Sequence, residues 1–299
     1  MSLAHGQILG GLSTVPDLDK AVAAYRDVLG LRLIDEARVG VDLAARWGTP
    51  ATAGARLATL QPLSGAPSFL RLVEQPDVAD FRPTRSCGWA AYEISVADIF
   101  ALANRLEGSA FRIIGPPKAI GSMSAFIPMQ VLGPAQEMLY LNQVLVDMAD
   151  LDLPRAGAEV DRIFIVILAT PDRAGTVQWY RDRLGLEEGA SFTIPYSMIN
   201  KAFDLPDDTQ TTLTMVQKGR LPIVEVDDYP PAATVRTAHP GRLPPGNALV
   251  TLAVDGLDRL DPAMFLVPPA ALPGPLYNGR RATTVRGPAG ELLELVEIG

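Results

Sequence analysis

The strongest constraint in this sequence is that it contains the same pattern twice. Asp17, near the start of the first copy, corresponds to Asp172, which lies 155 positions later. Near the end of each copy, residues 133–137 correspond to residues 287–291, which lie 154 positions later. An offset that changes by one position over half a chain indicates a tandem duplication. Two copies of one fold are therefore expected.

Each copy contains an internal pattern of one strand, one helix and three strands. Residues 8–15 form an apolar segment with β-branched side chains, and they predict a strand that Pro16 ends. Asp17 can cap the following helix, because its carboxylate accepts hydrogen bonds from the free amides of the first turn. Gly30 suits the left-handed position that ends a helix. The pattern starts again at residues 90–98, so each copy contains two such modules and the chain contains four.

The fourth module departs from this pattern. Its helix should begin near Asp255, but Pro262 follows almost at once and more prolines continue to Pro275. A proline inside a helix removes a hydrogen bond and clashes with the preceding turn. We therefore expect a short helical turn and a loop in this part of the chain.

The repeat also suggests domain boundaries. We place the first domain at residues 5–148, a linker at residues 149–157 and the second domain at residues 158–299. The linker is where aspartate, proline and glycine gather between the two patterned halves. A length of 299 residues is enough for two domains of ordinary size.

Composition and charge exclude several classes of function. No apolar segment approaches the roughly 20 residues of a membrane span, and residues 1–7 do not form a signal peptide, so we expect a cytoplasmic protein with no membrane partner. A net charge of −8 argues against nucleic acid as a partner, because a basic surface is expected there. The single cysteine, Cys87, excludes an internal disulfide and a cysteine-based zinc site.

Two motifs resemble those of one large superfamily. Residues 17–31, Asp-Leu-Asp-Lys-Ala-Val-Ala-Ala-Tyr-Arg-Asp-Val-Leu-Gly-Leu, resemble the opening of vicinal oxygen chelate domains. Residues 287–295, Gly-Pro-Ala-Gly-Glu-Leu-Leu-Glu-Leu, stand where that superfamily carries Asp-Pro-x-Gly-x-x-x-Glu. The superfamily includes glyoxalase I, bleomycin-resistance proteins and extradiol dioxygenases. The resemblance extends over nearly the whole chain, in four modules.

The resemblance implies the fold and the kind of partner. The expected fold class is α+β, with tandem βαβββ modules forming two glyoxalase-like domains. Curved mixed sheets would enclose a cavity in each domain, and a small-molecule ligand would bind there. The chain would be a monomer with an internal pseudo-dimer, or a homodimer.

The resemblance also locates the positions where relatives bind a divalent metal, which acts as a Lewis acid on two neighbouring substrate oxygens. Transferred to the first half of this chain, the four positions carry Gly10, Arg71, Ala91 and Tyr140. In the second half they carry Ile165, Glu225, Leu249 and Glu294. Ala91 and Leu249 are placed to within two residues. The only two histidines, His5 and His239, occupy none of these positions, so we expect that the histidines of the metal site have been lost.

Four of these residues are candidates for ligand binding. Arg71 and Tyr140 are expected in the first cavity, and Glu225 and Glu294 in the second. An arginine that points inward needs an acidic partner or an anionic ligand, because an unpaired buried charge is costly. Each residue also has a plainer interpretation: a snorkelling arginine, a core tyrosine, or a glutamate exposed at a strand edge.

Alternation along the last strand favours an inward Glu294. Leu292 and Glu294 share one face of that strand, because successive side chains point to opposite faces. Glu291 and Glu297 are expected at the surface. Glu93 shares a face with Ala91, so it can reach the first cavity, although exposure to solvent is an equally good interpretation.

Two functions remain open from the sequence. The first is a binding protein for a small aromatic or oxygen-bearing organic molecule, without a transition-metal site and without a cofactor. The second is an enzyme, namely a lyase, an isomerase or a ring-cleaving dioxygenase, with an atypical metal such as Mg²⁺ or Mn²⁺ at Glu225 and Glu294. Carboxylates and waters suit such hard cations. The missing histidines favour the first function, and the sequence does not decide whether the chain is catalytic.

Overall fold

The computed structural model describes residues 3–118 and 125–299. Its first sheet joins the first and fourth modules, in the order β14-β15-β16-β13-β1-β4-β3-β2. The first module supplies β1 (Ile8–Val15), β2 (Arg32–Arg38), β3 (Arg56–Gln61) and β4 (Phe69–Glu74). The fourth module supplies β13 (Gly246–Val254), β14 (Ala270–Ala271), β15 (Arg281–Arg286) and β16 (Leu292–Glu297).

The second sheet joins the second and third modules, in the order β10-β11-β12-β9-β5-β8-β7-β6. The second module supplies β5 (Gly88–Val96), β6 (Arg112–Gly115), β7 (Phe126–Leu132) and β8 (Met138–Val144). The third module supplies β9 (Val160–Thr170), β10 (Glu187–Pro195), β11 (Gln210–Lys218) and β12 (Leu221–Asp228). Both sheets are mixed, so the α+β class with four strand-rich modules is confirmed.

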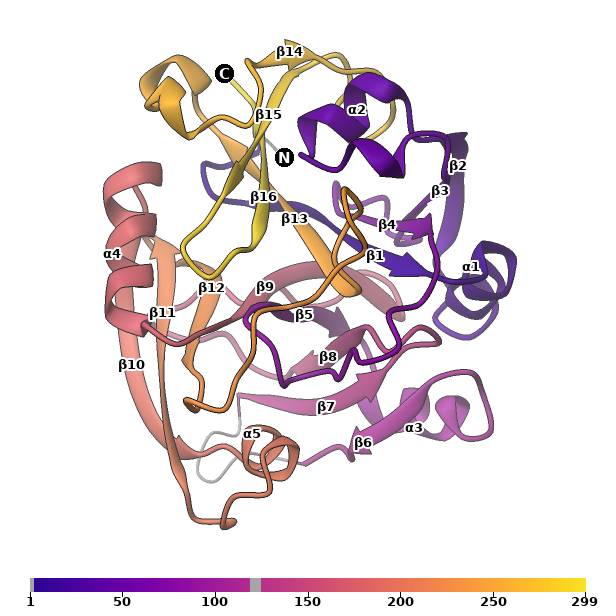
Figure 1. Ribbon diagram of the computed structural model, residues 1–299. Coiled ribbons are helices and arrows are strands. Elements are labelled where there is room, and N and C mark those ends of the chain that lie inside the picture. The colour runs from indigo at the N-terminus through magenta and orange to yellow at the C-terminus, as the bar shows by residue number, and fades with distance from the viewer. Residues whose placement is uncertain (1–2, 119–124) are drawn as a thin grey trace.

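The sheets do not follow the two halves of the sequence. The antiparallel pair of β1 and β13, seen near the centre of Figure 1, places Leu12 opposite Leu249. The antiparallel pair of β5 and β9 places Ala91 opposite Ile167. Each sheet therefore takes one module from each half, whereas the sequence predicted that residues 5–148 and 158–299 would each enclose a cavity of their own. The predicted boundaries divide the sequence repeat and not the sheets.

The helices are α1 (Leu18–Asp27), α2 (Val41–Arg46), α3 (Ile99–Leu106), α4 (Arg173–Leu184) and α5 (Ser197–Ala202), with 3₁₀ turns at Pro50–Thr52, Leu257–Arg259 and Pro262–Met264. The helices α1, α3 and α4 begin where the sequence predicts, whereas α2 and α5 were not predicted. The carboxylates of Asp17, Asp98 and Asp172 accept from backbone amides in the first turns of α1, α3 and α4. The fourth module has only 3₁₀ turns in place of a long helix, as its prolines predict.

A large core lies between the sheets, and two buried aromatic residues of β5 connect them. The indole Nε1 of Trp89 donates to the carbonyl of Leu292, and the hydroxyl of Tyr92 donates to the carbonyl of Leu12, each at 2.7 Å. The Tyr92 ring lies so close to β1 that a Cβ on Gly11 would be 2.5 Å from it. Glycine is therefore required at position 11, because any other residue would overlap the ring.

Candidate ligand-binding site

The structure brings the four predicted site residues together in two pairs, but the pairs differ from those predicted. Arg71 on β4 and Glu294 on β16 meet in the first sheet, where their side chains lie 2.8 Å apart. Tyr140 on β8 and Glu225 on β12 belong to the second sheet, and the Tyr196 hydroxyl contacts both. The predicted pairing of Arg71 with Tyr140, and of Glu225 with Glu294, is wrong because the first module joins the fourth.

In each sheet, the fifth-strand position of the site lies two residues beyond the residue that the resemblance gave, Ala91 or Leu249. Glu93 lies opposite Tyr140 in the pairing of β5 with β8, and Thr251 lies opposite Glu294 in the pairing of β13 with β16. These two residues replace Ala91 and Leu249. Alternation along β5 was the signal for Glu93, whereas nothing in the sequence distinguished Thr251.

We call the first group the Arg71 cluster; it consists of Trp47, Arg71, Thr251, Tyr277 and Glu294. The Arg71 guanidinium donates to the Tyr277 hydroxyl at 2.7 Å and to the Thr251 hydroxyl and Glu294 Oε2 at 2.8 Å each. Both hydroxyls donate in turn to Glu294 at 2.7 Å, and the Trp47 indole N–H donates to it at 2.9 Å. Each oxygen of Glu294 therefore accepts two hydrogen bonds.

The Arg71 cluster is closed to solvent and neutral overall. The side chains of Arg71 and Glu294 are only 3% and 2% exposed. The guanidinium carbon lies 5.5 Å from the centre of the Trp47 ring and 5.7 Å from that of Tyr277, a distance at which a cation is attracted to a ring face. Burial lowers the pKa of Arg71, but the Glu294 carboxylate and Tyr277 raise it more, so its pKa is above the ordinary value.

We call the second group the Glu225 cluster; it consists of Glu93, Tyr140, Asn142, Tyr196, Glu225 and Asp227. The Tyr196 hydroxyl lies 3.2 Å from Glu225 Oε1 and 3.4 Å from the Tyr140 hydroxyl. The Asn142 side-chain amide donates to Glu93 at 2.7 Å. Glu225 and Tyr196 are partly exposed, whereas the other four members are buried.

Three carboxyl groups with raised pKa values define the chemistry of the Glu225 cluster. Burial raises the pKa of Glu225 to about 7. Burial and the nearby charge of Glu225 raise the pKa values of Glu93 and Asp227 well above the ordinary range. No lysine, arginine or histidine in the described ranges acts on the three groups to lower these values. The cluster is therefore a concentration of acidic groups without a built-in cation.

Apolar side chains surround this acidic group. Ala91, Ile167 and Ala169 from β5 and β9 pack with Met138 and with Met198 of α5. The Phe203 ring, which directly follows α5, packs edge to face on the Tyr229 ring at 5.9 Å. An apolar wall with a few polar groups is typical of sites that bind small molecules.

The first two modules match a known family in sequence. Residues 8–129 match the family described as the Glyoxalase/Bleomycin resistance protein/Dioxygenase superfamily. The chain is similar to this superfamily over that range. No curated protein matches its sequence.

Two solved structures share this fold over nearly the whole chain. Glyoxalase I from Zea mays is 17% identical with a TM-score of 0.64, and the match covers 98% of this chain and 92% of the maize chain. A putative dioxygenase from Bacillus subtilis is 13% identical with a TM-score of 0.60, covering 99% of this chain and 86% of the other. At these identities the likeness establishes the four-module fold and leaves the function open.

The side chains of the Arg71 cluster do not fit the divalent metal that the superfamily implies. A Cβ on Gly10 would lie 2.4 Å from the carbonyl oxygen of Phe69, so this first-strand position has no room for a ligating side chain. The Arg71 guanidinium already provides the positive charge beside Glu294. A second cation there would be repelled by the first.

The Glu225 cluster does not present a set of metal ligands either. Within residues 3–118 and 125–299, no group of three or more His, Cys, Asp or Glu side chains is arranged to hold an ion. The suggested pair of Glu225 and Glu294 is also wrong, because these residues belong to different sheets and Glu294 is bonded to Arg71.

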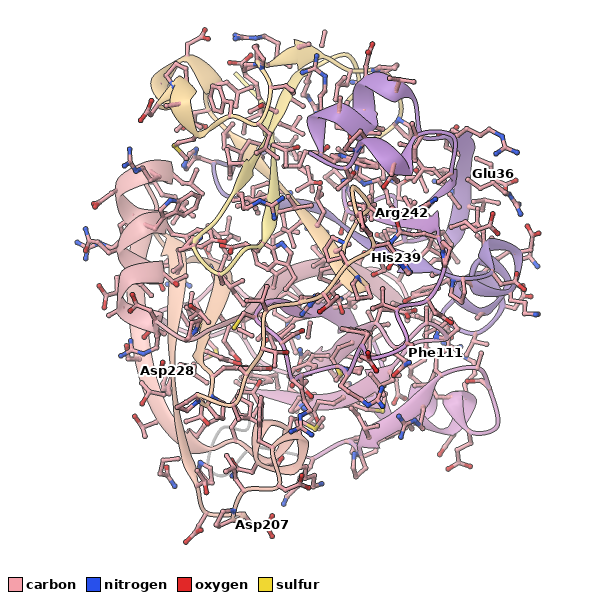
Figure 2. The ribbon with its side chains drawn as sticks, in the orientation of Figure 1. Glu36, Phe111, Asp207, Asp228, His239 and Arg242 are labelled. Carbon is pink, nitrogen blue, oxygen red and sulfur yellow. The ribbon has the colours of Figure 1, made fainter. Side chains whose placement is uncertain are left out.

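Both histidines contact the backbone away from the two clusters. His5 Nε2 lies 2.8 Å from the carbonyl of Leu184, and His239 Nε2 lies 3.0 Å from that of Asp77. Figure 2 shows His239 on the long loop that precedes β13. The structure therefore places neither imidazole with the site residues.

Within the described part of the chain, no helix is long and apolar enough to span a membrane.

One pair of glutamates that repeats in the two halves is buried, contrary to the sequence prediction for Glu291. The Tyr25 hydroxyl donates to Glu137 at 2.7 Å, and the Tyr180 hydroxyl donates to Glu291 at 3.0 Å. Burial raises the pKa of both carboxyl groups to about 7. The repeated Tyr and Glu were the signal for this contact, but alternation along the last strand does not extend into the turn that holds Glu291.

Proposed function

We propose that this protein binds a small organic molecule at the Glu225 cluster, and that the Arg71 cluster is structural. One observation carries the proposal. The two clusters occupy equivalent places in the two sheets, but only the first pairs its charged groups with one another. In the Arg71 cluster, the charged groups are bonded to one another and shielded from water. In the Glu225 cluster, the carboxyl groups lack a cation, and Glu225 and Tyr196 are partly exposed.

The chemistry around Glu225 suits a ligand with both an apolar body and polar groups. The buried side chains of Ile167, Met198 and Phe203 form the apolar part of this place, and the Tyr196 and Tyr140 hydroxyls lie within reach of Glu225. A ligand that binds here needs no metal from the protein. This is the first of the two functions that the sequence left open.

Methionine methyl groups provide a direct test. Met138 and Met198 lie on the apolar wall and Met215 lies opposite Glu225 on β11, whereas Met129 lies in the main core and Met264 packs against that core from the fourth module. We expect benzylamine, benzyl alcohol or benzoate, titrated into protein labelled with ¹³C at the methionine methyls, to shift the first three signals saturably. Shifts confined to Met264, or no saturable shift with any of the three compounds, would contradict the proposal.

A second candidate is an enzyme that transfers a proton, as an isomerase or a lyase does. It is favoured by the pKa of Glu225, about 7, because a carboxyl group with such a pKa can both accept and release a proton at neutral pH. Its test is exchange of the α-protons of dihydroxyacetone with deuterium from solvent. Exchange that the wild-type protein accelerates and Glu225→Gln does not would support catalysis, and equal rates with both proteins would exclude Glu225 as the base.

A further inference from the structure

The first sheet shows which residue stands at the position that corresponds to Glu225. Arg71 and Glu225 are 154 positions apart, which is the offset of the repeat, and they occupy matching strands β4 and β12. The six-residue helices α2 and α5 also correspond, and each is followed by an aromatic residue, Trp47 or Phe203. In the Arg71 cluster this arrangement holds a guanidinium between a carboxylate, two hydroxyls and two rings.

In the Glu225 cluster the corresponding cation is missing. Glu225 replaces the arginine, and Glu93 and Asp227 add two more carboxyl groups from β5 and β12. Three acidic groups close together oppose one another's ionisation, because like charges repel in a poorly hydrated place. A positive charge from outside the chain would relieve this repulsion.

Two buried oxygen atoms in the same cluster also lack a hydrogen-bond donor. Asn142 Oδ1 and Asp227 Oδ1 have no partner in the described structure, although both residues are only 1% exposed. The amide of Asn142 is held in the cluster by its bond to Glu93. Buried acceptors without donors are rare and costly in folded proteins. The cluster therefore leaves two buried acceptors without donors, and it also lacks a positive charge.

We propose that the ligand of the Glu225 cluster is a protonated primary amine with an aromatic or apolar body. This proposal rests on the proposed function and specifies its ligand class. An ammonium group brings one positive charge and three N–H donors, and it has no acceptor that would compete with the cluster. The partly exposed ring of Tyr196 can pack against the carbon body. The ammonium pairs with the Glu225 carboxyl as the Arg71 guanidinium pairs with Glu294, but it comes from another side, because Glu225 itself occupies the position that corresponds to Arg71.

Three probes of nearly equal shape test the charge directly. Benzylamine, benzyl alcohol and benzoate share one ring and differ mainly in charge. We expect benzylamine to shift the Met138, Met198 and Met215 methyl signals and to bind at least about tenfold more tightly than benzyl alcohol, a difference of about 1.4 kcal/mol. We expect no binding of benzoate at these signals, because its negative charge would be placed beside three acidic groups and no cation.

Matched variants assign the preference to Glu225. Glu225→Gln keeps the shape and removes the charge, so the amine should lose most of its advantage over the alcohol. Glu225→Arg supplies an internal cation, as Arg71 does, and should abolish amine binding. Asp207→Asn removes a carboxylate from the exposed turn between α5 and β11, which Figure 2 labels, and should leave the preference unchanged.

The outcomes separate this inference from the proposed function. If benzyl alcohol binds at the three methionines as tightly as benzylamine, the ammonium inference is overturned and the binding function stands. If none of the three probes shifts these signals, both are overturned. The comparison of probes on the wild-type protein decides the inference even if a Glu225 variant does not fold. An amine preference that survives Glu225→Gln but is lost in Asp207→Asn would also overturn it.

Discussion

The Arg71 cluster makes a quantitative prediction about stability. Arg71→Met removes three hydrogen bonds and leaves the Glu294 carboxylate buried without its cation. Removing one partner of a buried ion pair costs about 3–5 kcal/mol. Three donors, from Trp47, Thr251 and Tyr277, still hold the carboxylate. We therefore expect a loss near the lower end, about 3 kcal/mol in the free energy of unfolding.

The assay is equilibrium unfolding in urea at neutral pH, followed by tryptophan fluorescence. Arg71→Met/Glu294→Gln removes both charges and should recover much of the loss, because no uncompensated charge is then buried. Arg281→Met is the matched control. Arg281 on β15 pairs with Asp258 and with Glu297, which lies on the same strand as Glu294, but its side chain is 39% exposed. An exposed pair contributes about 0–1 kcal/mol, so this control should change stability little.

The reasoning fails if the two arginine variants cost the same. It also fails if the double variant is less stable than Arg71→Met alone. The cost of Arg71→Met would then not come from the unpaired charge of Glu294. A loss below about 1 kcal/mol for Arg71→Met would place this pair with ordinary surface ion pairs.

Two further predictions concern packing and pH. Gly11→Ala puts a Cβ 2.5 Å from the Tyr92 ring, so we expect a loss of about 1–3 kcal/mol from overpacking, measured by urea unfolding, whereas Gly54→Ala, with open space around it, should show only the strain of its positive φ. Glu291 has a pKa raised to about 7 in the folded protein, so it stays protonated there while the unfolded chain ionises near 4.5. The wild-type protein then loses stability as the pH rises from about 4.5 to about 7, and Glu291→Gln should gain on it over this interval by up to about 3 kcal/mol. A difference between the two proteins that does not change with pH would contradict the raised pKa of Glu291.

The sequence alone predicted those features that depend on neighbouring residues. Asp17, Asp98 and Asp172 act as helix caps because a capping carboxylate reaches amides only two or three residues away. Pro262 limits the fourth module to short turns by the same kind of local effect. The repeated motifs then predicted four modules and a resemblance to one superfamily, and alternation along the last strand favoured an inward Glu294.

Only the tertiary structure decided which modules share a sheet. Four similar modules present similar edge strands, so pairing of the first with the second or with the fourth agrees equally well with the local pattern. That choice placed Arg71 beside Glu294 instead of Tyr140, and it set Glu93, Glu225 and Asp227 together. The charge balance of each cluster is a sum over residues far apart in the chain. For this reason the sequence could nominate the site residues, but only the fold could show which cluster carries its own cation and which one lacks it.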